Sequence, residues 1–256
     1  FQDAAGNDNT ASEVFVWNHD SLAPTMTITT DSQGASPLTS NDNALNLIFT
    51  SSENTNNFTK DDIDVTKDGV ALSGADKDNV LSALTPQNPT NGFAKVYTAT
   101  LTPTPNVDAT YVVSVPVGRF TDEPGNNNTP LASFTWNYDA TKPTPSISVA
   151  RSSDSNAAVN DGDSVNEAVV VTIDTGENTT DLELADIVVA PATHNKSNFA
   201  GSDSTYTFTL TMTADDDYTI NIPINKYTDA AGNTNNALPQ QFSLSLDTAK
   251  PTPTIS

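Results

Sequence analysis

The chain contains no cysteine, few basic residues and no long apolar run. The absence of cysteine excludes disulfides, thiolate metal sites and cysteine nucleophiles. Lysine and arginine together number 10 against 32 aspartates and glutamates, and the formal charge of −22 repels nucleic acid. The longest apolar stretches, such as residues 168–171, have the length of a strand and fall far short of the roughly 20 residues of a membrane-spanning helix.

The composition instead favours strands and turns. Hydrophobic residues make up 36% of the chain and charged residues 16%, so neutral asparagine, threonine, serine and glutamine supply most of the polarity. These residues disfavour helices and suit turns and strand surfaces. A length of 256 residues favours about two domains. Because the sequence begins at Phe1 without an initiator methionine or a signal peptide, we expect a piece of a longer protein.

A two-part motif recurs three times along the chain. Its first part reads Phe/Tyr-x-Asp-x-x-Gly-Asn, and its second part, a linker, reads Asp-x-x-x-Pro-Thr. The linker aspartates Asp20, Asp139 and Asp247 are 119 and 108 residues apart, which is the size of a domain. We therefore divide the chain into the last strand of a preceding repeat (1–20), repeat one (21–139), repeat two (140–247) and the first strand of a following repeat (248–256).

Within each repeat, short runs of alternating apolar and polar residues are separated by Asn, Asp, Gly and Pro turns. This pattern predicts an all-β protein built of Greek-key β-sandwiches in a linear array. Trp17 and Trp136 are expected to pack in the last strand of a sandwich, and Tyr111 and Tyr218 to form tyrosine corners. The clearest predicted strands are 25–29, 46–49, 96–101, 111–115 and 132–136 in repeat one, and 146–149, 169–173, 206–210 and 218–222 in repeat two.

The recurring motif resembles the tandem bacterial Ig-like domains of large secreted or cell-surface adhesins, including biofilm and RTX-type adhesin repeats. The resemblance covers essentially the whole chain. It implies an extracellular rod of seven-stranded sandwiches, often with calcium at the domain junctions. Two of the copies depart from the pattern, since Glu123 and Pro124 replace small residues in the middle copy and the last copy lacks the tryptophan.

An Ig-like topology brings acidic residues together at each junction. If the first strand of repeat one runs away from the junction, the second strand returns to it and places Glu53 in the following loop. The next-to-last strand also runs toward the junction, so the loop with Asp122 and Asn126 lies beside the linker residue Asp20. Repeat two supplies the matching set of Asp139, Glu177, Asp229 and Asn233.

Hard oxygen donors without histidine or cysteine suit Ca²⁺ better than Zn²⁺. We therefore predict two complete calcium sites, one at each junction, with Asp3, Asn7 and Asp247 belonging to incomplete sites. A second interpretation needs no metal: Asp-x-x-Gly-Asn is also a good turn, because Asp caps its own backbone and Gly or Asn tolerates a positive φ. The proline of the linker could likewise act as a stiff spacer. Both interpretations can hold together.

Three function classes other than a covalent structural rod are relevant to this sequence: an enzyme, an assembled filament and a ligand-binding module. An enzyme is not expected, because His19 and His194 have no catalytic or metal-binding spacing and no phosphate-binding loop or nucleophile elbow is present. Partners are expected to be neighbouring repeats of the same chain, with any cell-surface or glycan target bound through other domains. An assembled filament remains an alternative to a covalent rod. A glycan- or ice-binding module is the other alternative, based on threonine rows at 98, 100, 102 and 104 and at 207, 209, 211 and 213.

Overall fold

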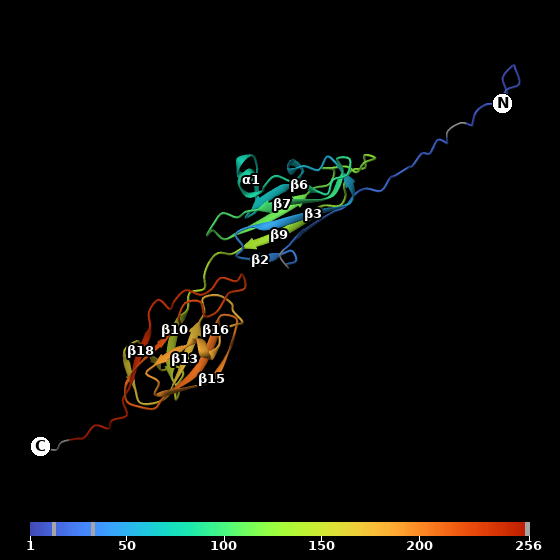
Figure 1. The fold of residues 1–256 in the computed structure, drawn as a ribbon. Coiled ribbons are helices and arrows are strands. Elements are labelled where there is room, and N and C mark those ends of the chain that lie inside the picture. The colour runs from blue at the N-terminus through green and yellow to red at the C-terminus, as the bar shows by residue number, and fades with distance from the viewer. Residues whose placement is uncertain (12–13, 32–33, 254–256) are drawn as a thin grey trace.

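The computed structural model describes residues 1–11, 14–31 and 34–253. Two β-sandwiches follow one another in a line, with the chain termini at opposite ends of the molecule (Figure 1). Each sandwich pairs a four-stranded with a five-stranded sheet. The all-β sandwich class predicted from the alternating runs is confirmed.

Repeat one forms the first sandwich. Its two sheets are antiparallel except where β2 runs parallel to β9. One sheet has the order β1 (Met26–Thr30), β3 (Leu45–Thr55), β7 (Ala94–Leu101) and β6 (Thr85–Gln87). The other has the order β2 (Leu38–Ser40), β9 (Ala132–Tyr138), β8 (Ala109–Val115), β4 (Asp64–Lys67) and β5 (Val70–Leu72).

Repeat two forms the second sandwich with the same plan. Here β12 runs parallel to β18, at the position that β2 and β9 occupy in the first sandwich. One sheet has the order β11 (Ala158–Val159), β10 (Ser146–Arg151), β13 (Val169–Asp174), β16 (Thr205–Met212) and β15 (His194–Ser202). The other has the order β12 (Asp163–Val165), β18 (Phe242–Leu246), β17 (Asp217–Asn221) and β14 (Val188–Ala190).

The first strand of each sandwich is divided between the two sheets. In repeat one β1 pairs with β3, and the chain then crosses to pair β2 with β9 on the other sheet. In repeat two β10 and β12 divide in the same way. This division, together with short edge strands, gives the described part of each sandwich more strands than the seven that the resemblance implied.

Large aromatic residues fill the cores. Trp136 is fully buried, lies against Tyr111 and Tyr138 and donates from its Nε1 to Ser40 Oγ at 3.1 Å. The predicted tyrosine corners are present, because Tyr111 Oη accepts from the Thr104 amide and Tyr218 Oη donates to the Ala214 carbonyl. Burial of these alternating faces is the main stabilising term of each sandwich.

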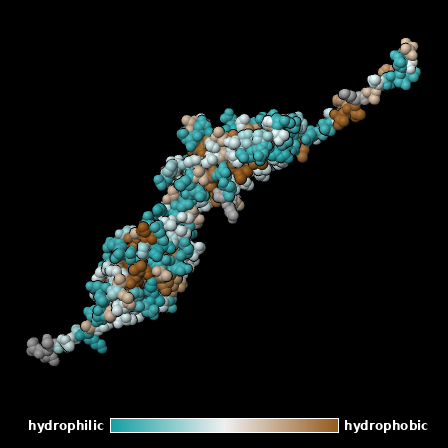
Figure 2. Space-filling view, viewed as in Figure 1, coloured by the Kyte–Doolittle hydropathy of each residue, from teal (hydrophilic) through white to brown (hydrophobic). Residues whose placement is uncertain are grey.

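The strand predicted for residues 1–20 does not form in the described part of that segment, residues 1–11 and 14–20. Residues 14–17 carry exposed apolar side chains on an extended tail, and Figure 2 shows hydrophobic surface on that tail. Trp17 is 73% exposed. A lone strand has no neighbour to pair its backbone groups, which is why Trp17 and Trp136 differ although they occupy the same place in the repeat. Of the strand predicted for 248–256, residues 254–256 lie outside the described residues and 248–253 form no strand.

The difference in length between the repeats lies partly in a short helix that the sequence pattern did not predict. Helix α1 (Ala75–Val80) precedes β6, while repeat two has no helix there. The short turns η1 (Lys60–Asp62) and η2 (Leu184–Asp186) are common to both repeats. In the described residues, no helix has the length and apolar character needed to cross a bilayer. The threonine rows lie on the outer faces of β7 and β16 and beyond their ends, half-buried or exposed.

Candidate metal centres

The structure brings three carboxylates together at the entrance to repeat one. Asp20, Glu53 and Asp122 each place a carboxylate oxygen within 4.8 Å of the other two, and we call this group the first cluster. Asp20 belongs to the linker and Asp122 to the loop between β8 and β9. Glu53 lies in β3 itself and not in the following loop as predicted. The β3–β7 register shifts between Thr50 and Thr55, and this irregularity carries Glu53 out of the regular ladder.

A second group has the same composition at the entrance to repeat two. Asp139, Glu177 and Asp229 place carboxylate oxygens within 4.8 Å of one another, and we call this group the second cluster. Asp139 directly follows β9, Glu177 follows β13, and Asp229 lies in the loop between β17 and β18. All six carboxylates predicted for the two junctions are therefore assembled as two groups of three.

The loop of each repeat is built around its own aspartate. In repeat two, Asp229 Oδ1 accepts from the amides of Ala231 and Asn233 at 2.9 and 2.8 Å, and Gly232 has a φ of +93° that favours glycine. In repeat one, Asp122 Oδ1 accepts from the amides of Gly125 and Asn126 at 2.8 and 2.7 Å. The turn interpretation is thus correct for the aspartates, and it explains why Asp122 and Asp229 are only 3% and 8% exposed.

The two predicted asparagine ligands use their amide nitrogens to fix the linker. Asn126 Nδ2 donates to Asp122 Oδ2 at 2.8 Å and to the Asp20 carbonyl at 3.3 Å. Asn233 Nδ2 donates to Asp229 Oδ2 and to the Asp139 carbonyl, both at 3.0 Å. Each asparagine therefore joins the loop aspartate to the linker, and in this arrangement it positions the cluster.

The turn interpretation does not account for the two glutamates. Glu53 Oε1 is buried and, among the described residues, has no hydrogen-bond partner. Burial and the charges of Asp20 and Asp122 raise the pKa of Glu53, although Lys95 opposes them. A buried, unpartnered carboxylate oxygen facing two more carboxylates is unfavourable unless a cation or proton compensates for it.

The second cluster shows the same electrostatic strain more strongly. Burial, followed by the charges of Asp139 and Asp229, raises the pKa of Glu177 to about 7. Burial and the charge of Asp229 also raise the pKa of Asp139, against a hydrogen bond from the Thr141 amide. For Asp122 the hydrogen bonds from Asn126 outweigh burial, so the pKa of Asp122 is lowered. Asp122 is thus held as an anion, while Glu53 and Glu177 bear the repulsion of the neighbouring carboxylates.

Both clusters border hollows that are open to solvent. The first cluster lines a hollow of about 230 Å³ that also includes Lys95 and Glu123. The second cluster contributes Asp139 and Glu177 to a hollow of about 510 Å³ between the two sandwiches. A small ion can therefore reach either cluster without rearrangement of the core.

Sequence reasoning missed a second aspartate that holds the linker. Asp108, in the loop before β8, accepts from the amides of Ala140 and Thr141 and from Thr141 Oγ1. The hydroxyl and amide hydrogen bonds of the linker lower the pKa of Asp108. Asp215 holds Thr248 after repeat two in a similar way. Nothing in the local sequence shows that the linker folds back over either position.

A repeated buried asparagine was also missed. Asn128 Oδ1 accepts from the amides of Arg119 and Phe120, and its Nδ2 donates to the Pro116 carbonyl. Asn235 makes the equivalent bonds in repeat two. Each lies six residues after its loop aspartate, Asp122 or Asp229, a spacing visible in the sequence. These asparagines fix the base of the loop that carries the cluster.

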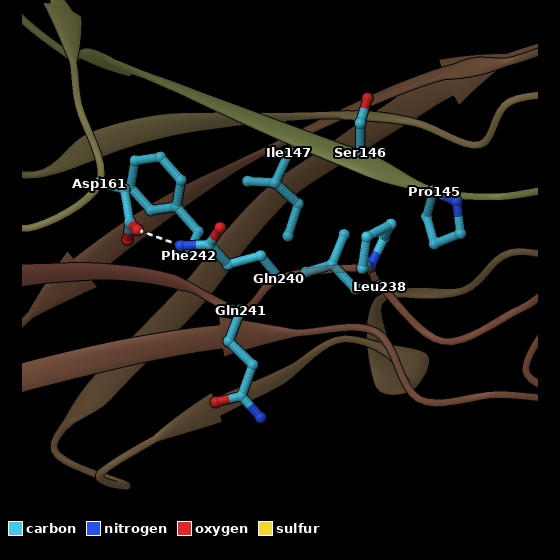
Figure 3. Close-up of a pocket in the computed structure, with 9 residues that line it drawn as sticks. Pro145, Ser146, Ile147, Asp161, Leu238, Gln240, Gln241 and Phe242 are labelled. Carbon is cyan, nitrogen blue, oxygen red and sulfur yellow. Dashed lines mark hydrogen bonds between the residues drawn. The ribbon is translucent and has the colours of Figure 1, made fainter.

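A separate hollow of about 340 Å³ lies on the flank of repeat two, between the start of β10 and β18 (Figure 3). Ile147, Leu238 and Phe242 supply apolar walls. Its acidic residue Asp161 already accepts from Gln240 Nε2 at 2.8 Å and from the Ser243 amide at 2.6 Å. Among the described residues, the buried side-chain oxygen that lacks any hydrogen-bond partner is instead Glu53 Oε1, in the first cluster.

Neither histidine is a member of the two clusters. His194 Nδ1 is hydrogen-bonded to the Pro191 carbonyl at 2.7 Å, and the ring of His19 lies 5.5 Å from that of Trp17. Oxygen atoms are therefore the donors that the two junctions offer, which is the donor type that Ca²⁺ prefers.

Comparison with known proteins identifies the fold of the second sandwich. Residues 139–246 match the family model described as the bacterial Ig-like domain. This match confirms the predicted resemblance for repeat two, and repeat one has the same strand plan. No curated protein matches the chain.

Three solved structures are similar to the chain at low identity. The Escherichia coli adhesin FdeC is 12% identical with a TM-score of 0.42, and 88% of this chain and 64% of that chain are covered. The I9–I11 tandem of titin is 9% identical with a TM-score of 0.24, covering 86% and 65%. The C-terminal domain of the Streptococcus agalactiae AgI/II polypeptide BspA is 9% identical with a TM-score of 0.35, covering 87% and 99%. The chain thus spans less than two thirds of the first two.

Proposed function

Because residues 139–246 form a bacterial Ig-like domain, we propose that the chain is a non-catalytic structural segment of an extracellular adhesin or surface filament, stiffened by calcium at its junctions. The observation that supports this function best is the repetition of one cluster at two junctions. Each cluster combines one linker carboxylate with two carboxylates of the repeat that follows. An isolated acidic loop would not require the linker residue to take part.

The donor sets fit Ca²⁺. Three carboxylates offer up to six oxygens, and Ca²⁺ takes six to eight oxygens from carboxylates, carbonyls and water. Asp20, Glu53 and Asp122 would hold the ion at the first junction, and Asp139, Glu177 and Asp229 at the second. A bound divalent ion supplies positive charge within each cluster; Lys95 borders the first cluster but, among the described residues, forms no ion pair with its carboxylates.

Electrostatics decides between a flexible and a stiff junction. Two unit charges 4 Å apart interact by about 4 kcal/mol at an effective dielectric constant of 20. With the cluster empty, this repulsion pushes the linker aspartate away from the loop aspartate and the glutamate. With a divalent cation bound, the same three groups are attracted to one point. The linker is then held against the end of the following repeat, and bound cation stabilises that arrangement by mass action.

This mechanism suits a protein outside the cell. Extracellular calcium modules bind with dissociation constants of about 10⁻⁴–10⁻³ M, so the clusters need only modest affinity. Neighbouring repeats of the same chain are the proposed partners, and any cell-surface target would be bound through other domains. The repeats act as spacers whose stiffness depends on calcium.

The proposal predicts two calcium ions per chain. In a calorimetric titration at pH about 8, above the raised pKa of Glu177, we expect two equivalents to bind with dissociation constants of about 10⁻⁴–10⁻³ M. Magnesium should bind more weakly, because it demands a tighter octahedral arrangement. Asp3→Ala is the matched control, since Asp3 holds the same turn in residues 1–9 outside both clusters. Absence of binding at millimolar calcium would contradict the proposal.

A further inference from the structure

Asn41 of repeat one is hydrogen-bonded to the cluster loop of repeat two. The backbone amide of Asn41 donates to the Ala231 carbonyl at 3.1 Å, and Asn41 Nδ2 donates to Asn233 Oδ1 at 3.1 Å. A Cβ on Gly232 would lie 3.6 Å from Asn41 Oδ1, so the loop and the asparagine are in close contact. These contacts cross the junction between the sandwiches and involve no carboxylate.

Asn233 connects this contact to the second cluster. While its Oδ1 accepts from Asn41, its Nδ2 donates to Asp229 Oδ2 and to the Asp139 carbonyl. One amide group thus contacts repeat one, the linker and the loop aspartate at once. Any change that fixes Asp139 and Asp229 also fixes the acceptor that Asn41 requires.

The same position is occupied by asparagine in both repeats. Asn41 directly follows β2, which pairs with β9, and Asn166 directly follows β12, which pairs with β18 in the same register relative to the linker. Asn41 is half-buried. Asn166 is exposed, and no hydrogen bond of its side chain is found among the described residues. The contact therefore depends on the presence of a following loop.

We propose that Asn41 is a docking residue through which repeat one recognises the Asp-x-x-Gly-Asn loop of repeat two, and that Asn233 couples this docking to cation binding in the second cluster. The docking itself needs no metal, and its coupling to calcium rests on the proposed function. Linkage requires reciprocity: if calcium strengthens docking, docking strengthens calcium binding by the same factor.

The test compares Asn41→Ala with the matched control Asn166→Ala. Amide resonances around Glu177 report calcium binding at the second cluster, and backbone relaxation in chelator reports the independent tumbling of the two sandwiches. Loss of one hydrogen bond corresponds to a change of about 2- to 10-fold. We expect Asn41→Ala to weaken calcium binding by about that factor and to increase independent tumbling in chelator, and Asn166→Ala to change neither.

The outcomes separate this inference from the calcium proposal. Equal tumbling of Asn41→Ala and Asn166→Ala in chelator would overturn the docking role. Altered tumbling with unchanged calcium affinity would overturn the coupling through Asn233. If the unmodified chain binds no calcium, the proposed function fails, while the tumbling measurement still decides whether Asn41 docks the repeats.

Discussion

Replacing Glu177 by glutamine is expected to weaken calcium binding at the second cluster by at least about tenfold, or 1.4 kcal/mol, while making the calcium-free protein more stable. The two effects have opposite signs because one carboxylate both attracts the cation and repels Asp139 and Asp229. After allowance for solvent screening, the stabilisation without calcium is on the order of 1 kcal/mol. Calcium titration followed by amide resonances and thermal unfolding in chelator measure the two effects.

Glu53→Gln is the matched variant for the first cluster. Each variant should impair its own cluster and leave the other unchanged, because the two groups belong to different junctions. If Glu177→Gln left the affinity of the second cluster unchanged, Glu177 would not be a ligand. If it destabilised the calcium-free protein, the repulsion inferred from the geometry would be absent.

Glu177→Gln should also weaken the pH dependence of two quantities, the stability of the calcium-free protein and the calcium affinity of the second cluster. The folded-state pKa of Glu177 is raised from 4.5 to about 7, so its protonated form favours the folded state. This contribution is complete below about pH 4.5 and is lost as the pH rises through about 7. Calcium binding has the opposite trend and strengthens over that range, because the ion requires the carboxylate. In Glu177→Gln, both the free energy of unfolding in chelator and the calcium affinity of the second cluster should therefore change less with pH, as measured by unfolding and calcium titration at several pH values.

Replacing Trp136 by alanine is expected to destabilise repeat one by about 3–5 kcal/mol. The side chain is fully buried between Tyr111 and Tyr138, and its removal leaves a cavity and the unpaired Ser40 hydroxyl. For a sandwich of this size, the melting temperature of repeat one should fall by roughly 10–20 °C. Differential scanning calorimetry should show this shift with little change in the transition of repeat two.

Trp17→Ala provides the control at the corresponding position of the preceding copy. Trp17 is 73% exposed, so its removal should change stability by less than about 0.5 kcal/mol. A destabilisation by Trp17→Ala comparable to that of Trp136→Ala would mean that residues 14–20 pack against a sandwich in solution. If the melting temperature of repeat one were the same in Trp136→Ala and in the unmodified chain, the described packing of Trp136 in the first core would be wrong.

Alternating strands could be predicted from the sequence because they bury one face. The predicted strand 111–115 lies within β8, and 206–210 lies within β16. Short edge strands such as β2 and β12 were not predicted, since three residues carry too little periodicity. Helix α1 was missed for a similar reason: it has six residues and buries none of them, so no apolar stripe marks it.

The grouping of the six carboxylates at the two junctions could be predicted, because the repeat places each of them at the same end of an antiparallel sandwich. The roles of the amides could not be assigned, because Asn126 and Asn233 can coordinate through oxygen or donate through nitrogen, and the sequence does not choose between them. The contacts that Asn41 and Asp108 make depend on how the two sandwiches meet across the linker. Such contacts are set by three-dimensional packing and leave no periodic signal in the sequence.

Small-angle scattering with and without calcium tests the junction mechanism most directly. A chain that carries both Glu53→Gln and Glu177→Gln serves as the reference without sites. We predict that saturating calcium narrows the distance distribution of the unmodified chain toward the extended, in-line arrangement, that chelator broadens it, and that the double variant does not respond. An unmodified chain with the same distribution in calcium and in chelator would contradict calcium-dependent stiffening.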